Sequence, residues 1–122
     1  KFMLAISEFA ALVYLATAQI PKGCVSTYGA IAQAIGRPQA NRAVGQALHR
    51  NPFSPAVPCH RVVGQNGRLI GFAQGLKTQK DLLNKEGIAI SSQGKIINFN
   101  MVFYQPKLCL STINKLSKNY TS

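Results

Sequence analysis

Helical periodicity dominates the first third of the chain. Between residues 7 and 19, apolar side chains recur three and four positions apart, at Phe9, Leu12, Val13 and Ala16. This pattern predicts an amphipathic helix with Ser7 as its N-cap. A second helix is predicted from Tyr28 to Ile35, because Thr27 can cap its first turn and Gly36 suits its end.

A third helix is expected after a tight turn. Pro38 suits a first helical turn, so we predict a helix from there to about Arg50. Two helices joined so closely are typical of a helix-turn-helix, although many helical cores share this pattern. The third helix carries unusually small side chains, at Ala40, Ala43, Gly45 and Ala47. Such a helix could enter a widened minor groove or pack closely against another helix.

The middle of the chain is rich in residues that end helices. Three prolines lie within residues 52–58, so we expect this segment to be extended and stiff rather than helical. The stretch from Val62 to Phe72 predicts a small β-hairpin about a turn at residues 64–67.

The last predicted elements are a helix and a strand. The helix runs from Thr78 to Lys85, with Leu82 and Leu83 facing inward and Gly87 ending it. The residues from Ile96 to Tyr104 alternate weakly, which indicates a strand.

These elements predict a mainly α fold, a helix-turn-helix or winged-helix-like DNA-binding domain with a small β-hairpin. The 122 residues fit one domain, and 47% hydrophobic residues suffice for a packed core. We assign this domain to residues 1–104. Residues 105–122 form a C-terminal tail that we expect to be poorly ordered.

The charge balance favours a polyanionic partner. Fourteen lysines and arginines face three acidic residues, which gives a net charge of +11. Nucleic acid is the first partner to consider, and an anionic lipid surface is the alternative. No apolar run is long enough to cross a membrane. Three widely spaced cysteines and two histidines suit neither a standard zinc site nor full disulfide pairing, so we expect a reducing, intracellular compartment and no metal.

One dipeptide carries the chemistry. Cys59 is followed directly by His60. A thiol has a pKa of about 8.5, so it needs a nearby base or positive field to react as a thiolate at neutral pH. His60 could act as that base, with Glu86 orienting its ring. A Cys-His dipeptide is more often structural than catalytic, so the dipeptide alone does not decide.

The surrounding residues carry a family resemblance. The matching segments are Val25-Ser26-Thr27-Tyr28-Gly29, Arg42-Ala43-Val44-Gly45, Asn51-Pro52, Val57-Pro58-Cys59-His60-Arg61-Val62-Val63, Gly71-Phe72 and Leu82-Leu83-Asn84-Lys85-Glu86-Gly87. In order and spacing they resemble the C-terminal domain of the O6-alkylguanine-DNA alkyltransferases, the methylated-DNA–protein-cysteine methyltransferases. Members of this family usually carry a further N-terminal α/β domain, for which this chain has no room.

The resemblance implies a role for each matching residue of the active site. Cys59 resembles the alkyl acceptor, activated through a water by His60, with Glu86 completing the relay. Tyr28 resembles the residue that helps to rotate the nucleotide and protonates N3 of the departing guanine. Asn51 matches a hinge asparagine. Without the resemblance, Tyr28 would be a buried aromatic residue and Asn51 an ordinary helix stop.

The resemblance also implies a DNA surface. Arg42 looks like the finger that replaces a flipped-out guanine in the base stack, although alone it would be a phosphate contact or a solvated charge. The neighbouring DNA-contacting residues are predicted to be Thr27, Tyr28, Ala40, Asn41 and Gly45. The substrate pocket is predicted to involve Val62, Phe72, Ala73 and Ser54. Phe72 stands where tyrosine is common, and Ser54 where some relatives have proline.

The function implied is direct-reversal DNA repair. A monomer would bind O6-alkylguanine in double-stranded DNA through the minor groove and transfer the alkyl group once to Cys59, without a cofactor. Its compartment would be the cytoplasm or nucleoid of a bacterium, or a eukaryotic nucleus. The short chain also resembles the alkyltransferase-like proteins, non-catalytic lesion sensors that typically have tryptophan or alanine at the acceptor position, where this chain has Cys59. A helix-turn-helix regulator, which would prefer one DNA sequence, is the third hypothesis.

Overall fold

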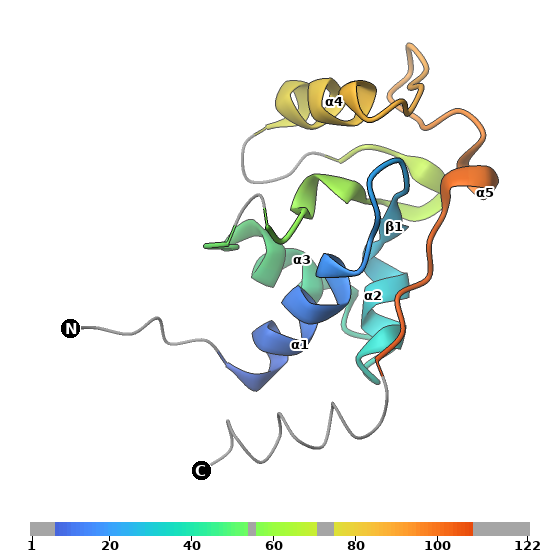
Figure 1. Cartoon of the computed structure of the whole chain (residues 1–122). Helices are drawn as coiled ribbons and strands as arrows, with labels where there is room; N and C mark the ends of the chain where they lie inside the picture. Colours follow the sequence, from blue (N-terminus) through green and yellow to red (C-terminus); the bar gives the residue numbers. More distant parts are fainter. Residues whose placement is uncertain (1–6, 54–55, 71–74, 109–122) are drawn as a thin grey trace.

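The computed structural model describes residues 7–53, 56–70 and 75–108 (Figure 1). Within these residues the elements, in chain order, are α1 (Glu8–Ala18), β1 (Ser26–Thr27), α2 (Tyr28–Ala34), α3 (Asn41–His49), the 3-10 turn η1 (Cys59–Arg61), β2 (Val62–Val63), the 3-10 turn η2 (Gln65–Gly67), α4 (Leu76–Lys85) and α5 (Phe99–Val102). The predicted helix-rich fold with a small β element is confirmed.

Local capping explains where the first two helices begin. The Ser7 hydroxyl accepts the Ala10 N–H at 3.1 Å, and the Thr27 hydroxyl accepts the Ala30 N–H at 3.0 Å. Each bond satisfies an amide that has no partner inside its helix. Gly36, just beyond α2, has a φ of +79°, a conformation that glycine adopts without strain. Both predicted caps are therefore confirmed.

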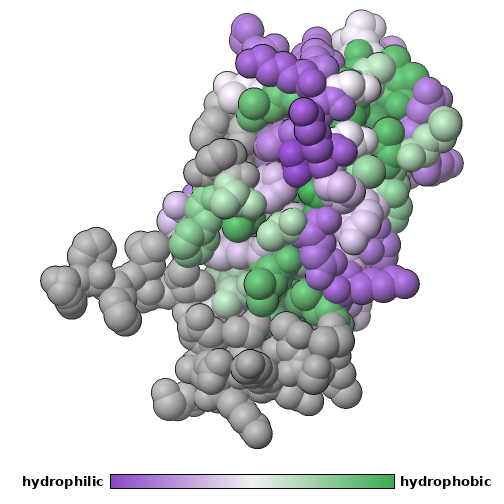
Figure 2. All heavy atoms as spheres, viewed as in Figure 1, coloured by the Kyte–Doolittle hydropathy of each residue, from purple (hydrophilic) through white to green (hydrophobic). Residues whose placement is uncertain are grey.

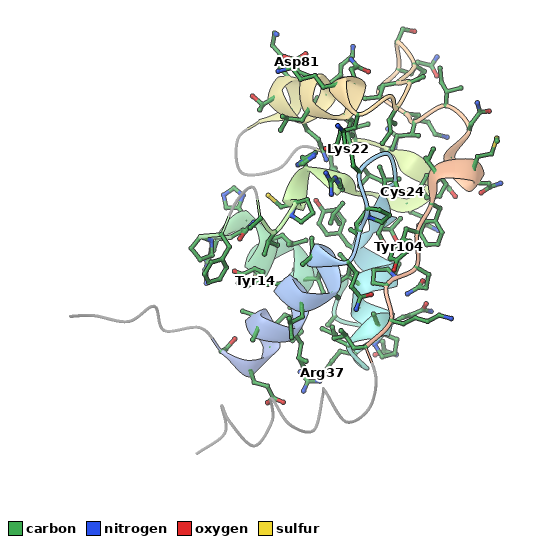
Figure 3. All side chains as sticks on the ribbon, viewed as in Figure 1. Tyr14, Lys22, Cys24, Arg37, Asp81 and Tyr104 are labelled. Carbon is green, nitrogen blue, oxygen red and sulfur yellow. The ribbon has the colours of Figure 1, made fainter. Side chains whose placement is uncertain are left out.

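The main core lies between α1, α2 and α3. Its fully buried members include Leu12 and Val13 of α1, Ile31 of α2 and Val44 of α3. The Tyr14 hydroxyl donates a hydrogen bond to the Ala47 carbonyl at 2.7 Å, so α1 is also tied to α3 (Figure 3). This packing sets the angle at which α3 is presented.

The third helix begins later than predicted. It starts at Asn41 rather than Pro38, because the Ala40 N–H donates to the Arg37 carbonyl at 2.9 Å and closes a turn there. Its end at His49, with Arg50 as C-cap, agrees with the prediction.

The predicted β-hairpin is replaced by a parallel pair. The chain does reverse at η2, where the Gly64 N–H donates to the Arg68 carbonyl at 2.8 Å. However, β2 pairs in parallel with β1, with Ser26 opposite Val62, and Arg68 bridges to Lys95 instead. Both residues of β2 are fully buried, which is typical of a parallel pair and unlike an exposed hairpin arm. Phe72, the predicted end of the hairpin, lies outside the described residues.

Helix α4 packs over a second, smaller core. It begins at Leu76, two residues before the predicted Thr78. Leu83 is fully buried as predicted, whereas Leu82 is only half-buried. Gly87 follows the helix with a φ of +88°, which confirms it as the terminator. Hydrophilic residues cover much of the α4 end of the molecule (Figure 2).

The strand predicted from Ile96 to Tyr104 is wrong. Asn98 adopts a left-handed conformation with a φ of +60°, which interrupts extended backbone, and residues 99–102 form the short helix α5. Beyond it, Lys107 exchanges two hydrogen bonds with the Gln19 side chain. The boundary at residue 104 stays a prediction, and residues 109–122 lie outside the described part of the chain. Within that part, no helix is long and apolar enough to cross a membrane.

Candidate active site and DNA-binding surface

A three-residue ion-pair network lies beside Cys59. The turn η1 carries His60 and Arg61, and Glu86 stands at the C-cap of α4. His60 Nε2 lies 2.9 Å from Glu86 Oε2, and Arg61 donates from Nε to Oε1 at 2.9 Å and from Nη2 to Oε2 at 2.8 Å. Arg61 Nη1 also donates to the Ile20 carbonyl at 2.8 Å, which connects the network to the end of α1.

The charge state of Glu86 follows from these contacts. Burial raises the pKa of this carboxyl, but the hydrogen bonds and positive charges of Arg61 and His60 outweigh it, so the pKa lies below its ordinary value of 4.5. Glu86 is therefore ionised at neutral pH and accepts hydrogen bonds only. When His60 donates Nε2–H to it, the basic lone pair of the neutral ring is on Nδ1.

Gln79 is a site residue that the sequence reasoning missed. It is fully buried in α4, and its Nε2 donates to the carbonyls of His60 and Val62, each at 3.1 Å. These bonds fix the backbone on both sides of Arg61. The available signal was one polar residue four positions before Leu83, on the inward face of the predicted helix.

Asn51 holds the turn that leads to Cys59. Its Nδ2 donates to the Val57 carbonyl at 2.9 Å, and its Oδ1 accepts the Phe53 N–H at 2.8 Å. The Val57 N–H also donates to the Phe53 carbonyl at 3.0 Å. The segment therefore folds back here instead of running extended as predicted. Ser54, a predicted pocket residue, lies outside the described residues.

Cys59 is buried close to Tyr28. The cysteine is 4% exposed, and its N–H donates to the Val57 carbonyl at 2.9 Å. Burial raises the pKa of the Tyr28 hydroxyl, and a charge on Cys59 raises it further. Tyr28 is therefore protonated, and able to donate, at neutral pH.

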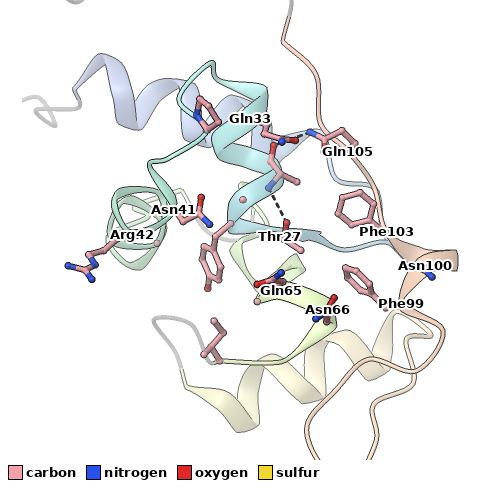
Figure 4. A pocket seen from close by; sticks show the side chains of 17 residues that line it. Thr27, Gln33, Asn41, Arg42, Gln65, Asn66, Phe99, Asn100, Phe103 and Gln105 are labelled. Carbon is pink, nitrogen blue, oxygen red and sulfur yellow. Dashed lines mark hydrogen bonds between the residues drawn. The ribbon is translucent and has the colours of Figure 1, made fainter.

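A cleft of about 890 Å³ has Tyr28 in its lining, whereas Cys59 does not line it (Figure 4). Its lining includes four more of the predicted DNA-contacting residues, namely Thr27, Asn41, Arg42 and Gly45. Arg42 is exposed, and Figure 4 shows its side chain extending away from the body of α3. A Cβ at Gly45 would lie 3.7 Å from the Tyr28 ring, an ordinary van der Waals contact, so α3 and the ring lie side by side here. Ala40, the N-cap residue of α3, is half-buried and does not line the cleft.

The remaining predicted pocket residues are only partly described. Val62 is fully buried in β2, and its N–H donates to the Cys59 carbonyl. Phe72 and Ala73 lie outside the described residues. No cluster of three metal-ligating side chains occurs in the part of the chain that the structure describes.

Comparison with protein families decides the membership of the chain. The family model of the 6-O-methylguanine DNA methyltransferase DNA-binding domain matches residues 8–88. The chain belongs to this family. The match includes α1 through α4 and the His60–Glu86 contact, and it ends before α5.

Curated relatives extend the comparison. The methylated-DNA–protein-cysteine methyltransferase of Methanosarcina acetivorans is 52% identical over 81 residues, which cover 66% of this chain and 52% of that protein. The enzyme of the same name from Salmonella typhimurium is 51% identical over 75 residues, 62% of this chain and 44% of that protein. The chain thus spans about half the length of the curated relatives it matches.

Solved structures give two kinds of neighbour. S. pombe Atl1, in complex with damaged DNA containing O6-carboxymethylguanine, matches with a TM-score of 0.69 and 38% identity, over 81% of this chain and 96% of that chain. Mycobacterium tuberculosis OGT in complex with DNA matches with a TM-score of 0.64 and 44% identity, over 66% of this chain and 50% of that chain. The fold is therefore found both in a short protein and in part of a longer one.

Proposed function

We propose that this protein is a methylated-DNA–protein-cysteine S-methyltransferase, which moves an alkyl group from O6-alkylguanine in duplex DNA to the sulfur of Cys59. The observation that carries the proposal is Cys59 next to His60, whose Nε2 lies 2.9 Å from an ionised Glu86. Membership of the family and the DNA complexes of its relatives support it. Such a protein works where DNA is, in the bacterial cytoplasm or nucleoid or in a eukaryotic nucleus.

The first step forms the nucleophile. His60 accepts the Cys59 proton at Nδ1, directly or through one water, while Glu86 stabilises the resulting imidazolium. Gln79 and Asn51 hold the backbone of this loop, so the sulfur and the ring keep their relative positions.

The second step is an in-line displacement at the alkyl carbon. The thiolate forms a carbon–sulfur bond as the bond from that carbon to O6 breaks, and the electron pair leaves on guanine. Tyr28 donates its proton to N3, because a neutral guanine is a better leaving group than its anion. The tyrosinate regains a proton from solvent or from His60. A thioether is not readily cleaved, so each chain acts once.

The base must leave the duplex before it can meet a buried sulfur. Unstacking costs a few kcal/mol, and Arg42 on α3 offsets this by filling the gap and bonding the orphaned cytosine. The small residues of α3, with Asn41 and Gly45 beside Arg42, allow the helix into a widened minor groove. Thiolate displacement of this kind calls on neither a metal nor an organic cofactor.

Intact-protein mass spectrometry tests the proposal. After incubation with a duplex containing O6-methylguanine, we expect a gain of one methylene per chain, located at Cys59 by peptide mapping. Cys59→Ser should abolish the gain, whereas Cys24→Ser, at a half-buried free cysteine, should leave it unchanged. More than one methyl group per chain, or labelling at Cys24, would contradict the mechanism.

A non-catalytic lesion sensor is the second candidate. The observation behind it is the similarity in fold, with a TM-score of 0.69, to S. pombe Atl1 in complex with damaged DNA containing O6-carboxymethylguanine. A sensor would bind the O6-methylguanine duplex more tightly than unmodified DNA and gain no mass. Cys59 favours transfer, since binding alone needs no thiol there.

A further inference from the structure

The cleft beside Tyr28 has two walls of different origin. One wall comes from α2 and α3, through Thr27, Gln33, Asn41 and Arg42. The opposite wall is the segment from Phe99 to Gln105, which lies beyond the part of the chain that matches the family model. Figure 4 shows Asn100 on this segment and Arg42 at opposite edges of the cleft, with Gln65 and Asn66 between them.

The C-terminal wall is firmly attached. Val102 and Tyr104 bond the two backbone groups of Val25, at 2.9 and 2.7 Å, just before β1. The Gln105 side chain donates to the Ala30 carbonyl of α2 at 2.9 Å. The Phe99 ring packs so closely on Gly67 that a Cβ there would approach it to 2.9 Å. The cleft is therefore preformed, with little movement needed to admit a ligand.

Its lining has the chemistry of a DNA backbone site. Amide side chains surround it, from Gln33, Asn41, Gln65, Asn66 and Asn100. Amide N–H groups donate readily to phosphate oxygens, and apolar surface from Phe99, Phe103 and Ile70 suits deoxyribose. None of the three acids of the chain lines it, and Arg42 supplies a positive edge.

We propose that one strand of the DNA duplex runs through this cleft, held between α3 and the Phe99–Gln105 segment. This C-terminal wall thus extends the DNA-binding surface beyond the helix-turn-helix. This inference rests on the proposed DNA partner but not on alkyl transfer. The cleft is continuous with Tyr28 and Arg42, so the gripped strand would be next to the base that is extracted.

Negative charges introduced into the cleft test the proposal. Asn100→Asp places a negative charge on exposed α5, and Asn66→Asp places one on the neighbouring loop, where aspartate tolerates the φ of +63°. Gln93→Glu is the matched control, because it adds the same charge at an exposed residue that does not line the cleft. Fluorescence anisotropy with labelled duplexes, with and without O6-methylguanine, gives the affinities, and thermal unfolding checks that each variant is folded.

We expect each cleft variant to bind both duplexes about fivefold to tenfold more weakly than wild type, with the loss shrinking as salt is raised. Gln93→Glu should lose less than about twofold. Methyl transfer to Cys59 by Gln93→Glu should match the wild type. Failure of transfer in the wild type would sink the enzyme proposal while leaving this one standing.

Three binding results would overturn the proposed role of the C-terminal wall. They are wild-type affinity in both cleft variants, an equal loss in Gln93→Glu, and an absence of duplex binding by the wild type. A dimer that Asn100→Asp disrupts, with DNA affinity unchanged, would also overturn it and assign the cleft to a second copy of the chain.

Discussion

The three-helix unit α1–α3 and the unit made by η1 and α4 are held together in different ways. Between the three helices, fully buried Leu12, Ile31 and Val44 pack against one another, with a single hydrogen bond from Tyr14 across the interface of α1 and α3. Between η1 and α4, directional bonds from Gln79 and Glu86 hold the loop.

The two kinds of contact serve different purposes, stability in the apolar unit and the positioning of reactive groups in the polar unit. Burial of apolar surface is not directional, so it stabilises the fold while tolerating small shifts of each side chain. Hydrogen bonds and ion pairs fix the positions of particular atoms to a few tenths of an ångström. The apolar packing of the three helices therefore stabilises the fold and positions α3, and the polar unit keeps Cys59 and His60 in fixed relative positions.

The largest effect should come from breaking the apolar unit. Leu12→Ala removes a fully buried side chain from α1, and a substitution of this kind typically costs about 3 kcal/mol of unfolding free energy. Leu15→Ala, one turn along on the same helix at a residue 42% exposed, should cost under about 1 kcal/mol. Urea denaturation measures both. A similar loss in the two variants would show that α1 does not anchor the core, and the methyl-transfer rate per folded chain should be normal in each.

Whether a contact is local or joins distant residues decides what the sequence could predict. Ser7 and Thr27 cap helices through bonds to residues three positions away, so a local pattern was enough to find α1 and α2. The pairing of Ser26 with Val62 joins residues 36 positions apart, and no local pattern distinguishes it from a hairpin. Likewise the weak alternation of the expected strand gave no sign of the left-handed Asn98, which directly precedes α5.

Prediction of the site followed a similar rule. The contact of His60 with Glu86, 26 positions later, was expected from the chemistry of a Cys-His pair and from the family resemblance, and not from spacing. Gln79 was missed because a lone polar residue on an apolar helix face gives no hint of its partners, which are backbone carbonyls of a distant loop. The roles of Cys59, Tyr28 and Arg42 stay predictions until chemistry is measured.

An intermediate effect is expected from the buried amide of the polar unit. Gln79→Leu keeps the size of the side chain but deprives the His60 and Val62 carbonyls of their donor, at a cost of about 2 kcal/mol. Unlike Leu12→Ala, it should also slow methyl transfer in the folded protein, because the loop that carries Cys59 is loosened. Single-turnover kinetics at saturating DNA measures this. Gln93→Leu, at an exposed residue, is the control. A normal rate of methyl transfer in Gln79→Leu would show that the Gln79 amide does not position the site.

The smallest effect, and the one with a pH signature, concerns Glu86. Because its pKa is lowered in the folded protein, the ionised carboxylate adds stability that is fully present above its ordinary value of 4.5 and is lost as pH falls through the lowered pKa. Glu86→Gln should therefore cost on the order of 1 to 2 kcal/mol at pH 7, and the gap to the wild type should close progressively below about pH 4.5. Asp81→Asn in α4 is the matched control. Its side chain is 55% exposed and pairs with Lys77, which is 88% exposed, so a cost of about 0.5 kcal/mol or less is expected. Urea denaturation from pH 3 to pH 7 gives both profiles. A constant difference in unfolding free energy between wild type and Glu86→Gln across this range would mean that Glu86 stabilises the loop by its shape and not by its charge. The polar unit would then resemble the apolar unit.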